Sequence, residues 1–443
     1  MFDVGSSFSY KGLYKCCQKV NALLLNLKII RSLIALQIRT MIAKDGLSMN
    51  VSLLKNEIHD RIQRFQERFS AQGVDGALIV EKTDLYYLSG TKQDAHLFIP
   101  DGDAPLLMVR KDFHRAVSES PLEEIFPLTG YSELPHLISK GNDAYPRRLG
   151  LEMDVLPTNL YFLYQKLFPK TELVDISRLI REIRMVKSEY EIARIRAAAE
   201  MADGMYKEVP EFLTTARTEL ELSIMVEAYY RKRGHPGIVP TRGFNLDAIY
   251  GHIMSGEDAA MPSASPGPTG GKGLGPFYSQ GAGMGKIKPH SPILIDYCAN
   301  LDGYVADSTR IFSLGNLNAP LVHAHEVMLE VQETLVELGV PGTQAEDLYR
   351  AALDIVEKAG LSNGFMGSPK GVPFVGHGIG LDLDEWPVIG KGAQTRLEEG
   401  MVIAMEPKMV FPGVGVVGIE NTVVVTTTGM KRLIRYPDVI SVC

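Results

Sequence analysis

The stretch SPILIDYCANLDGYVADSTR, residues 291–310, places two carboxylates where a strand pattern calls for apolar core. Asp296 ends an apolar run, and Asp307 follows eleven residues later. Between them, LDG at 301–303 is a signal typical of a tight hairpin turn. In a two-residue hairpin, residues on the two arms share a face when their separation is odd, whichever two residues of LDG form the turn. We therefore predict that Asp296 and Asp307 project to one side, where their like charges need a cation or a proton.

Three further segments place ionisable residues in strand-like apolar contexts. FVGHGIGLDLDEWP holds His377 between Gly376 and Gly378, which leave room for a close approach. LEEGMVIAMEPKMV and GVGVVGIENTVVV contain Glu406 and Glu420, and the FPGVG between them is a chain reversal. These two glutamates are therefore expected to approach each other across antiparallel strands.

The resulting set is four acids and one histidine: Asp296, Asp307, His377, Glu406 and Glu420. Oxygen-rich ligation with one imidazole suits two hard or borderline divalent ions, such as Mn, Co, Fe or Zn. The sequence therefore predicts a two-metal site.

The rest of the chain alternates helix and strand signals. An amphipathic helix is predicted to end at Gly73, followed by the strand GALIV and then a turn toward Tyr86, Tyr87 and Gly90. This alternation, up to about residue 175, predicts an α/β layer domain. Ser188 is a predicted helix N-cap, which places the domain boundary near 176–187. The second half is predicted to hold helices at 188–210, 217–233, 319–338 and 343–360, and strands at 292–298, 303–312, 401–411 and 415–427.

Composition excludes some classes of function. The net charge of −7 without a long basic run argues against nucleic acid as a partner. The four cysteines have no metal-binding spacing and favour a reducing compartment, so a cytoplasmic location is expected. The Gly- and Pro-rich segment 263–285 reads as a functional loop but lacks the features of a phosphate loop.

Residues 1–48 are apolar with interspersed Lys and Arg, and fit neither a signal peptide nor a membrane span. We expect an extension without stable membrane insertion, with Met41 or Met49 as the functional start, although an interfacial amphipathic helix is an alternative. Its deletion is expected to leave folding, metal content and activity unchanged.

Across about residues 55–430, the chain resembles the creatinase/prolidase/methionine aminopeptidase superfamily. The resemblance rests on the Asp-(ten residues)-Asp hairpin, His-Gly-Ile-Gly, Glu-Pro and Ile-Glu-Asn, and on the segments DLYYLSG and VKSEYEIARIRAAAEMAD. It implies an α+β fold: an α/β creatinase-like N-terminal domain at 49–178 and a pita-bread catalytic domain at 187–443. A homodimer is also implied.

The resemblance also implies roles for the five residues. Asp307 and Glu420 would bridge two metal ions, with manganese favoured, while Asp296 would bind one ion and His377 and Glu406 the other. A metal-bridging hydroxide would attack the substrate. Glu406 would handle the proton of that nucleophile.

Accessory positions depart from the peptidases of this family. Ser263, Pro373 and Asp384 stand where histidines are usual, and Gly418 stands where an arginine is common. His252, on a predicted strand, is our candidate for a replacement acid or base, and His235 is a second one. We expect His290 at a strand edge, and His323 and His325 on a helix surface. Trp386 is a candidate lining residue of the pocket.

Three functions follow from these features. The first is a metallopeptidase cleaving an Xaa-Pro bond, of the aminopeptidase P or prolidase type. The second is a non-peptidase enzyme acting on a small molecule, such as a dimethylsulfoniopropionate-cleaving lyase. Those lyases carry a similar DEWP segment, but Cys298 here replaces the second Asp of their Asp-x-Asp pattern. The third is a metal-free binding protein, against which the unpaired carboxylates argue.

Overall fold

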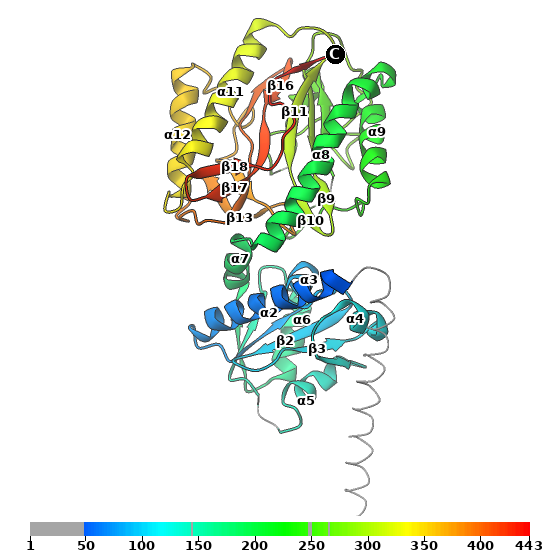
Figure 1. Cartoon of the computed structure of the whole chain (residues 1–443), viewed down its shortest axis with the longest axis vertical. Helices are drawn as coiled ribbons and strands as arrows, with labels where there is room; N and C mark the ends of the chain where they lie inside the picture. The colour runs from blue at the N-terminus through cyan, green and yellow to red at the C-terminus, as the bar shows by residue number, and fades with distance from the viewer. Residues whose placement is uncertain (1–47, 143–144, 247–249, 265) are drawn as a thin grey trace, which may run out of the picture. The chain divides into compact units, whose positions relative to one another are not determined.

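The computed structural model describes residues 48–142, 145–246, 250–264 and 266–443. The chain divides into two compact units, Met1–Ile176 and Ser177–Cys443, coloured along the chain in Figure 1. The predictions for the extension up to residue 47 lie outside the described residues. Among the helices in the described part of the chain, none is long and apolar enough to cross a membrane.

The first unit contains a mixed six-stranded sheet in the order β4-β3-β2-β1-β5-β6. Strand β1 pairs antiparallel with β2 and parallel with β5. All four residues of β1 are buried, as expected for a central strand. The strands are β1 (Gly76–Ile79), β2 (Ala95–Pro100), β3 (Leu106–Val109), β4 (Glu124–Pro127), β5 (Arg148–Leu151) and β6 (Glu172–Asp175).

Short helices accompany this sheet, and one of them corrects a prediction. The turn predicted around Tyr86 and Tyr87 is wrong, because residues Lys82–Ser89 form helix α3. The Glu81 carboxylate caps its N-terminus by accepting from the backbone N–H groups of Thr83 and Asp84, and Gly90 ends it in the left-handed conformation. The other helices are α2 (Ser48–Ser70), α4 (Phe113–Glu119), η2 (Tyr131–Glu133), α5 (Leu134–Ile138) and α6 (Thr158–Leu167).

The second unit is built on a larger sheet with the strand order β13-β12-β14-β17-β11-β8-β7. Strand β18 pairs with β17, and β19 pairs with β11. The strands are β7 (Gly251–Ser255), β8 (Ile293–Tyr297), β11 (Ser308–Ser313), β12 (Phe374–Gly378), β13 (Glu385–Gly390), β14 (Val402–Met405), β17 (Glu420–Thr426), β18 (Gly429–Arg432) and β19 (Ser441–Val442).

Two hairpins extend from this sheet. Their arms are β9 (Ala299–Leu301) with β10 (Tyr304–Ala306), and β15 (Lys408–Phe411) with β16 (Gly415–Gly418). Three strands predicted as continuous are therefore each divided in two: 303–312 at Asp307, 401–411 at Glu406 and Pro407, and 415–427 at Ile419. Each break falls at or beside a predicted site residue.

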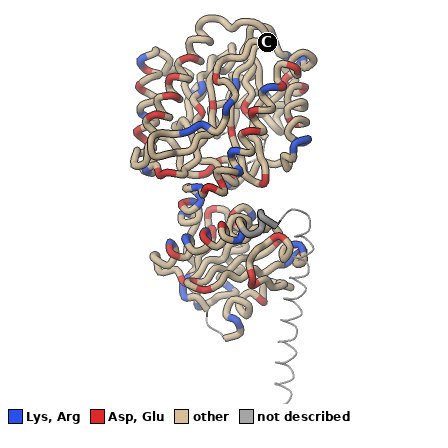
Figure 2. Tube along the Cα trace, in the orientation of Figure 1, with Lys and Arg blue, Asp and Glu red and all other residues tan. Residues whose placement is uncertain are grey.

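Figure 1 shows two helix pairs flanking this sheet, α8 with α9 and α11 with α12. Helices α8 and α9 each begin with a complete capping box, formed by Ser188 with Glu191 and by Thr218 with Glu221. Figure 2 shows basic and acidic residues interspersed along both units. The helices are α7 (Ser177–Met185), α8 (Glu189–Thr215), α9 (Glu219–Lys232), α10 (Gly256–Ala259), α11 (Ala319–Leu338) and α12 (Ala345–Lys358).

Candidate metal centre

Three neighbouring strands place two of the carboxylates on one face of the sheet, with a strand between them. Asp296 in β8 lies opposite Thr309 in β11, and Thr309 lies opposite Glu420 in β17. The β9–β10 hairpin turns at Asp302 and Gly303, which both have positive φ. Asp302-Gly303 is one of the two residue pairs of LDG that the sequence allowed as the turn. Asp296 and Asp307 line the same cavity.

A second hairpin brings the two glutamates together. Strands β14 and β17 pair Met405 with Asn421, and β15 and β16 pair Lys408 with Gly418. Continuing this register places Glu406 opposite Glu420. His377 lies in the neighbouring strand β12, with its Nε2 3.8 Å from Glu406 Oε1.

The side chain of Lys408 lies among these carboxylates, which the sequence analysis missed. Its Nζ is 3.0 Å from Asp296 Oδ2, 2.9 Å from Glu406 Oε2 and 2.8 Å from Glu420 Oε2. Burial lowers the pKa of Lys408, but the charges of the three carboxylates raise it well above its usual value. The side chain is only 1 % exposed, so a buried ammonium lies at the centre of the cluster.

The sequence held a signal for Lys408. Residues two apart in an extended strand point to the same face, so an apolar strand that directs Glu406 into the site directs Lys408 there as well. A lysine in such a buried position requires paired anions.

The other side of the cluster is formed by Asp307, His377 and Glu420. One ligand atom from each lies within 4.8 Å of the other two. Asp307 accepts hydrogen bonds from the backbone N–H of Ser308 and from Cys298 Sγ. Burial and the charge of Asp296 nevertheless raise the pKa of Asp307 to about 7, so this side of the cluster favours a cation or a proton.

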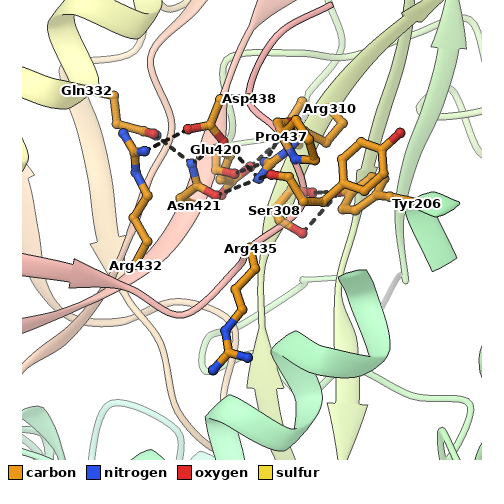
Figure 3. A network of polar contacts seen from close by, with 12 residues as sticks. Tyr206, Ser308, Arg310, Gln332, Glu420, Asn421, Arg432, Arg435, Pro437 and Asp438 are labelled. Carbon is orange, nitrogen blue, oxygen red and sulfur yellow. Dashed lines mark hydrogen bonds and ion pairs between the residues drawn. The ribbon is translucent and has the colours of Figure 1, made fainter. Parts of the chain in front are cut away.

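A buried arginine links β11, which follows Asp307, to β17, which begins at Glu420 (Figure 3). Arg310 in β11 donates to the backbone carbonyl of Glu420 at 2.9 Å and to Asn421 Oδ1 at 2.9 Å. It also donates to the carbonyls of Tyr436 and Pro437 and pairs with Asp438. Asn421 in turn donates to Gln332 of α11. This network ties the C-terminal segment to the strands behind the site.

The cluster opens into a cavity of about 370 Å³. This is the size of a small ligand pocket. Trp386, the candidate from the sequence, contributes to the wall, and Arg181 lies over its ring. Four residues of the Gly- and Pro-rich loop, 266–269, also line the cavity. Within segment 263–285, the described residues form no helix and no strand longer than an isolated bridge.

His252 lines this cavity from β7, directly opposite Asp296 in β8. Its Nδ1 lies 3.3 Å from Thr269 Oγ1 of the loop, and its buried Nε2 has no hydrogen-bond partner among the described residues. Burial lowers the pKa of His252. A neutral imidazole with an uncommitted nitrogen is suited to proton transfer.

The four other histidines considered from the sequence lie outside the cavity. His235 uses both ring nitrogens, accepting from Gly237 N and lying 3.3 Å from the carbonyl of Cys298. His290 and His323 are exposed. The prediction of a surface position is wrong for His325, which is buried with its Nε2 against the carbonyl of Asp438. None of these four lines the cavity.

The DEWP segment contributes through two acids. Asp384 lies beside His377, with 3.8 Å between Oδ1 and Nδ1. Glu385 is buried and forms ion pairs with Arg184 of α7 and with Lys187. Burial raises the pKa of Glu385, but Arg184 and Lys187 lower it to about 2. Glu385 therefore anchors this wall of the cavity.

Two family models match this chain. Residues 193–427, more than half of the chain, match the model described as Metallopeptidase family M24. Residues 61–186 match the Creatinase/Prolidase N-terminal domain. A curated Xaa-Pro dipeptidase of Pyrococcus furiosus is 28 % identical over 380 residues, covering 85 % of this chain and 98 % of the relative.

Solved structures agree in fold. A prolidase of Pyrococcus horikoshii has a TM-score of 0.72 and 27 % identity, and the match covers 85 % of this chain and 99 % of that one. An Xaa-Pro dipeptidase from Bacillus anthracis has a TM-score of 0.74 at 23 % identity, covering 87 % and 100 %. The predicted fold class, a creatinase-like α/β domain followed by a pita-bread domain, is confirmed.

The metal ions implied by a metallopeptidase family fit this site in part. Asp307, His377 and Glu420 offer two carboxylates and an imidazole, a donor set suited to a divalent ion such as manganese or zinc. On the other side, Lys408 Nζ already occupies the space between Asp296, Glu406 and Glu420. The residues present therefore fit one ion directly, and a second only if Lys408 moves.

Proposed function

Because the chain belongs to metallopeptidase family M24, we propose that this metallopeptidase-like hydrolase cleaves Xaa-Pro dipeptides in a divalent-metal-dependent reaction. The observation that carries the proposal is the convergence of Asp307, His377, Glu406 and Glu420 on the floor of one cavity. The Xaa-Pro dipeptidases and prolidases among the relatives support the substrate class. Manganese is the ion that we favour, and the number of ions depends on Lys408.

A bound divalent ion would polarise the scissile carbonyl and lower the pKa of water. Asp307, His377 and Glu420 would hold it. Glu406 lines the cavity, and its Oε1, which is 3.8 Å from His377 Nε2, would accept the proton of the attacking water while Lys408 holds Oε2. His252 lines the cavity from β7 and would relay to the leaving amine the proton that Glu406 takes from the water, accepting it on one ring nitrogen and releasing it from the ring.

Substrate profiling tests this proposal. The Mn²⁺-reconstituted chain should release proline from Xaa-Pro dipeptides, and a chelator should stop the release. Gly-Leu and Ala-Ala serve as matched dipeptides without proline. Hydrolysis of these at the same rate, or no hydrolysis of any dipeptide with Mn²⁺, Co²⁺, Fe²⁺ or Zn²⁺, would overturn the proposal.

One observation favours the alternative of a non-peptidase on the same scaffold. Positions 263, 373 and 384, where family peptidases carry histidines, hold Ser, Pro and Asp, while the cavity lining includes the DEW residues 384–386. Dimethylsulfoniopropionate therefore belongs in the same assay. Its rapid turnover without peptide cleavage would favour the alternative. A homodimer and a cytoplasmic location stay predictions.

A further inference from the structure

The ammonium of Lys408 is held as a bound cation would be. Its three contacts, at 2.8–3.0 Å, go to Asp296, Glu406 and Glu420, which come from different strands or strand ends. An ammonium has three N–H donors and no acceptor, so three carboxylates satisfy it completely. We call the three carboxylates of Asp296, Glu406 and Glu420 the cage. The cage therefore already contains a positive charge, which the chain supplies.

The opposite strand leaves room for this side chain. Lys408 pairs with Gly418, whose φ is +151°. A Cβ added at Gly418 would lie 2.7 Å from Lys408 Cα and 3.1 Å from Lys408 Cγ. A residue with a side chain at position 418 would thus press on the stem of Lys408. The observed position of the Lys408 side chain therefore requires a glycine at position 418.

The carboxylate charges that Lys408 does not neutralise still need a cation. The cluster contains four carboxylates, and Lys408 neutralises one of these charges. Its ion pairs go to Asp296, Glu406 and Glu420, and none goes to Asp307. Asp307, His377 and one oxygen of Glu420 remain grouped within 4.8 Å on the other side. A second divalent ion would have to share the cage of Lys408, where like charges repel strongly at short range.

We propose that the Lys408 ammonium permanently takes the position of one of the two metal ions, so that each chain binds a single divalent ion at Asp307, His377 and Glu420. This inference deepens the proposed function, on which it rests, by assigning one of the two positive centres to the polypeptide. Lys408 would also hold Glu406 and Asp296 in place without any ion. It would therefore be a positioning residue of the site.

Metal stoichiometry tests the proposal. The full chain is dialysed against Mn²⁺ at increasing concentration, and bound manganese is measured by native mass spectrometry and elemental analysis. We expect the wild type to saturate at one ion per chain and Lys408→Ala, which vacates the cage, at two. Lys187→Ala is the matched control, because it also removes a buried ammonium, paired with Glu385, outside the cluster. It should remain at one ion.

The results that would overturn this inference differ from those that would refute the proposed function. Two ions, or none, in the wild type would overturn the proposal, as would a folded Lys408→Ala variant that still binds one. If Lys408→Ala fails to fold, the metal content of Asp296→Asn tests the proposal. Retention of one ion at wild-type affinity supports it. A fall from two bound ions to one overturns it. One bound ion without cleavage of any dipeptide would support this inference and refute the proposed function.

Discussion

Glu406 has one oxygen at Lys408 and the other at His377, so its two contacts link the ammonium to the opposite side of the cluster. We predict that Glu406→Gln lowers kcat for an Xaa-Pro dipeptide by about 10²- to 10⁴-fold, because an amide cannot accept the proton of the attacking water. Bound manganese should be largely retained, since Asp307, His377 and Glu420 are unchanged. The measurements are steady-state kinetics and metal content.

The control for this variant is Glu399→Gln, which changes an exposed carboxylate outside the cavity. It should behave as the wild type. Full activity of Glu406→Gln with full metal content would remove Glu406 from the chemistry.

His252 differs from the other described histidines because it reaches the cavity and keeps one buried ring nitrogen without a partner among the described residues. We predict that His252→Ala lowers kcat by about 10²-fold or more with little change in bound manganese, as expected for loss of a proton-transfer group. His323→Ala, on the exposed face of α11, is the control. Unchanged kinetics in His252→Ala would exclude this residue from the site.

At the scale of elements, the β15–β16 hairpin determines where Lys408 points. We predict that Gly418→Ala destabilises the protein by about 1–3 kcal/mol, through a strained positive φ and a clash of the new Cβ with the carbonyl of Pro407. Gly413→Ala, in the turn of the same hairpin, also has a positive φ but has nothing within 4 Å of the new Cβ. Urea unfolding should show a larger loss for Gly418→Ala. Equal losses would show that the contact with Lys408 and Pro407 is unimportant.

Elements with strong local signals were predictable from the sequence. The capping residue Ser188 marks the start of α8, although the helix continues to Thr215 and does not end at residue 210 as predicted. The prediction for 217–233 matches α9 within two residues, and the LDG triplet marks the β9–β10 turn. Helix α3 was missed because its cap is the side chain of Glu81, which is an unusual N-cap residue. The strand breaks at Asp307 and Glu406 were missed because strand-forming apolar residues lie on both sides of each break.

The site itself was predictable only in part. Alternation along strands indicates that the carboxylates converge and that Lys408 shares the face of Glu406, but it does not show that the lysine contacts three carboxylates. Lys408 was overlooked because its partners Asp296 and Glu420 are 112 and 12 residues away, and a lone lysine in a strand usually faces solvent. The Arg310 network with Asp438 likewise depends on contacts distant in the sequence.

At the scale of the whole molecule, the buried ion pairs of Glu385 make the stability of the second unit depend on pH. Arg184 and Lys187 lower the pKa of Glu385 from 4.5 to about 2. A lowered native pKa contributes stability that is present above the unfolded-state value and is lost as the pH falls through the native value. The contribution of Glu385 is therefore expected to disappear between about pH 4.5 and 2.

We predict that Glu385→Gln lowers the free energy of unfolding at pH 7 by about 3 kcal/mol, because it leaves Lys187 buried without its anion and removes one of the anions paired with Arg184, which keeps Asp382. The difference between wild type and variant should shrink below pH 4.5. Chemical denaturation of both proteins across this pH range measures it. A difference that stays constant down to pH 2 would contradict the assignment.

Lys408 and one divalent ion are proposed to provide the two positive centres that the family resemblance assigns to two metal ions. The most direct measurement is anomalous diffraction from crystals of the full chain grown with Mn²⁺ and measured at the manganese edge. We predict one anomalous peak, bounded by Asp307, His377 and Glu420, with Lys408 Nζ within hydrogen-bonding distance of Asp296 and Glu406. Two peaks, with the Lys408 side chain displaced from the carboxylates, would contradict the account.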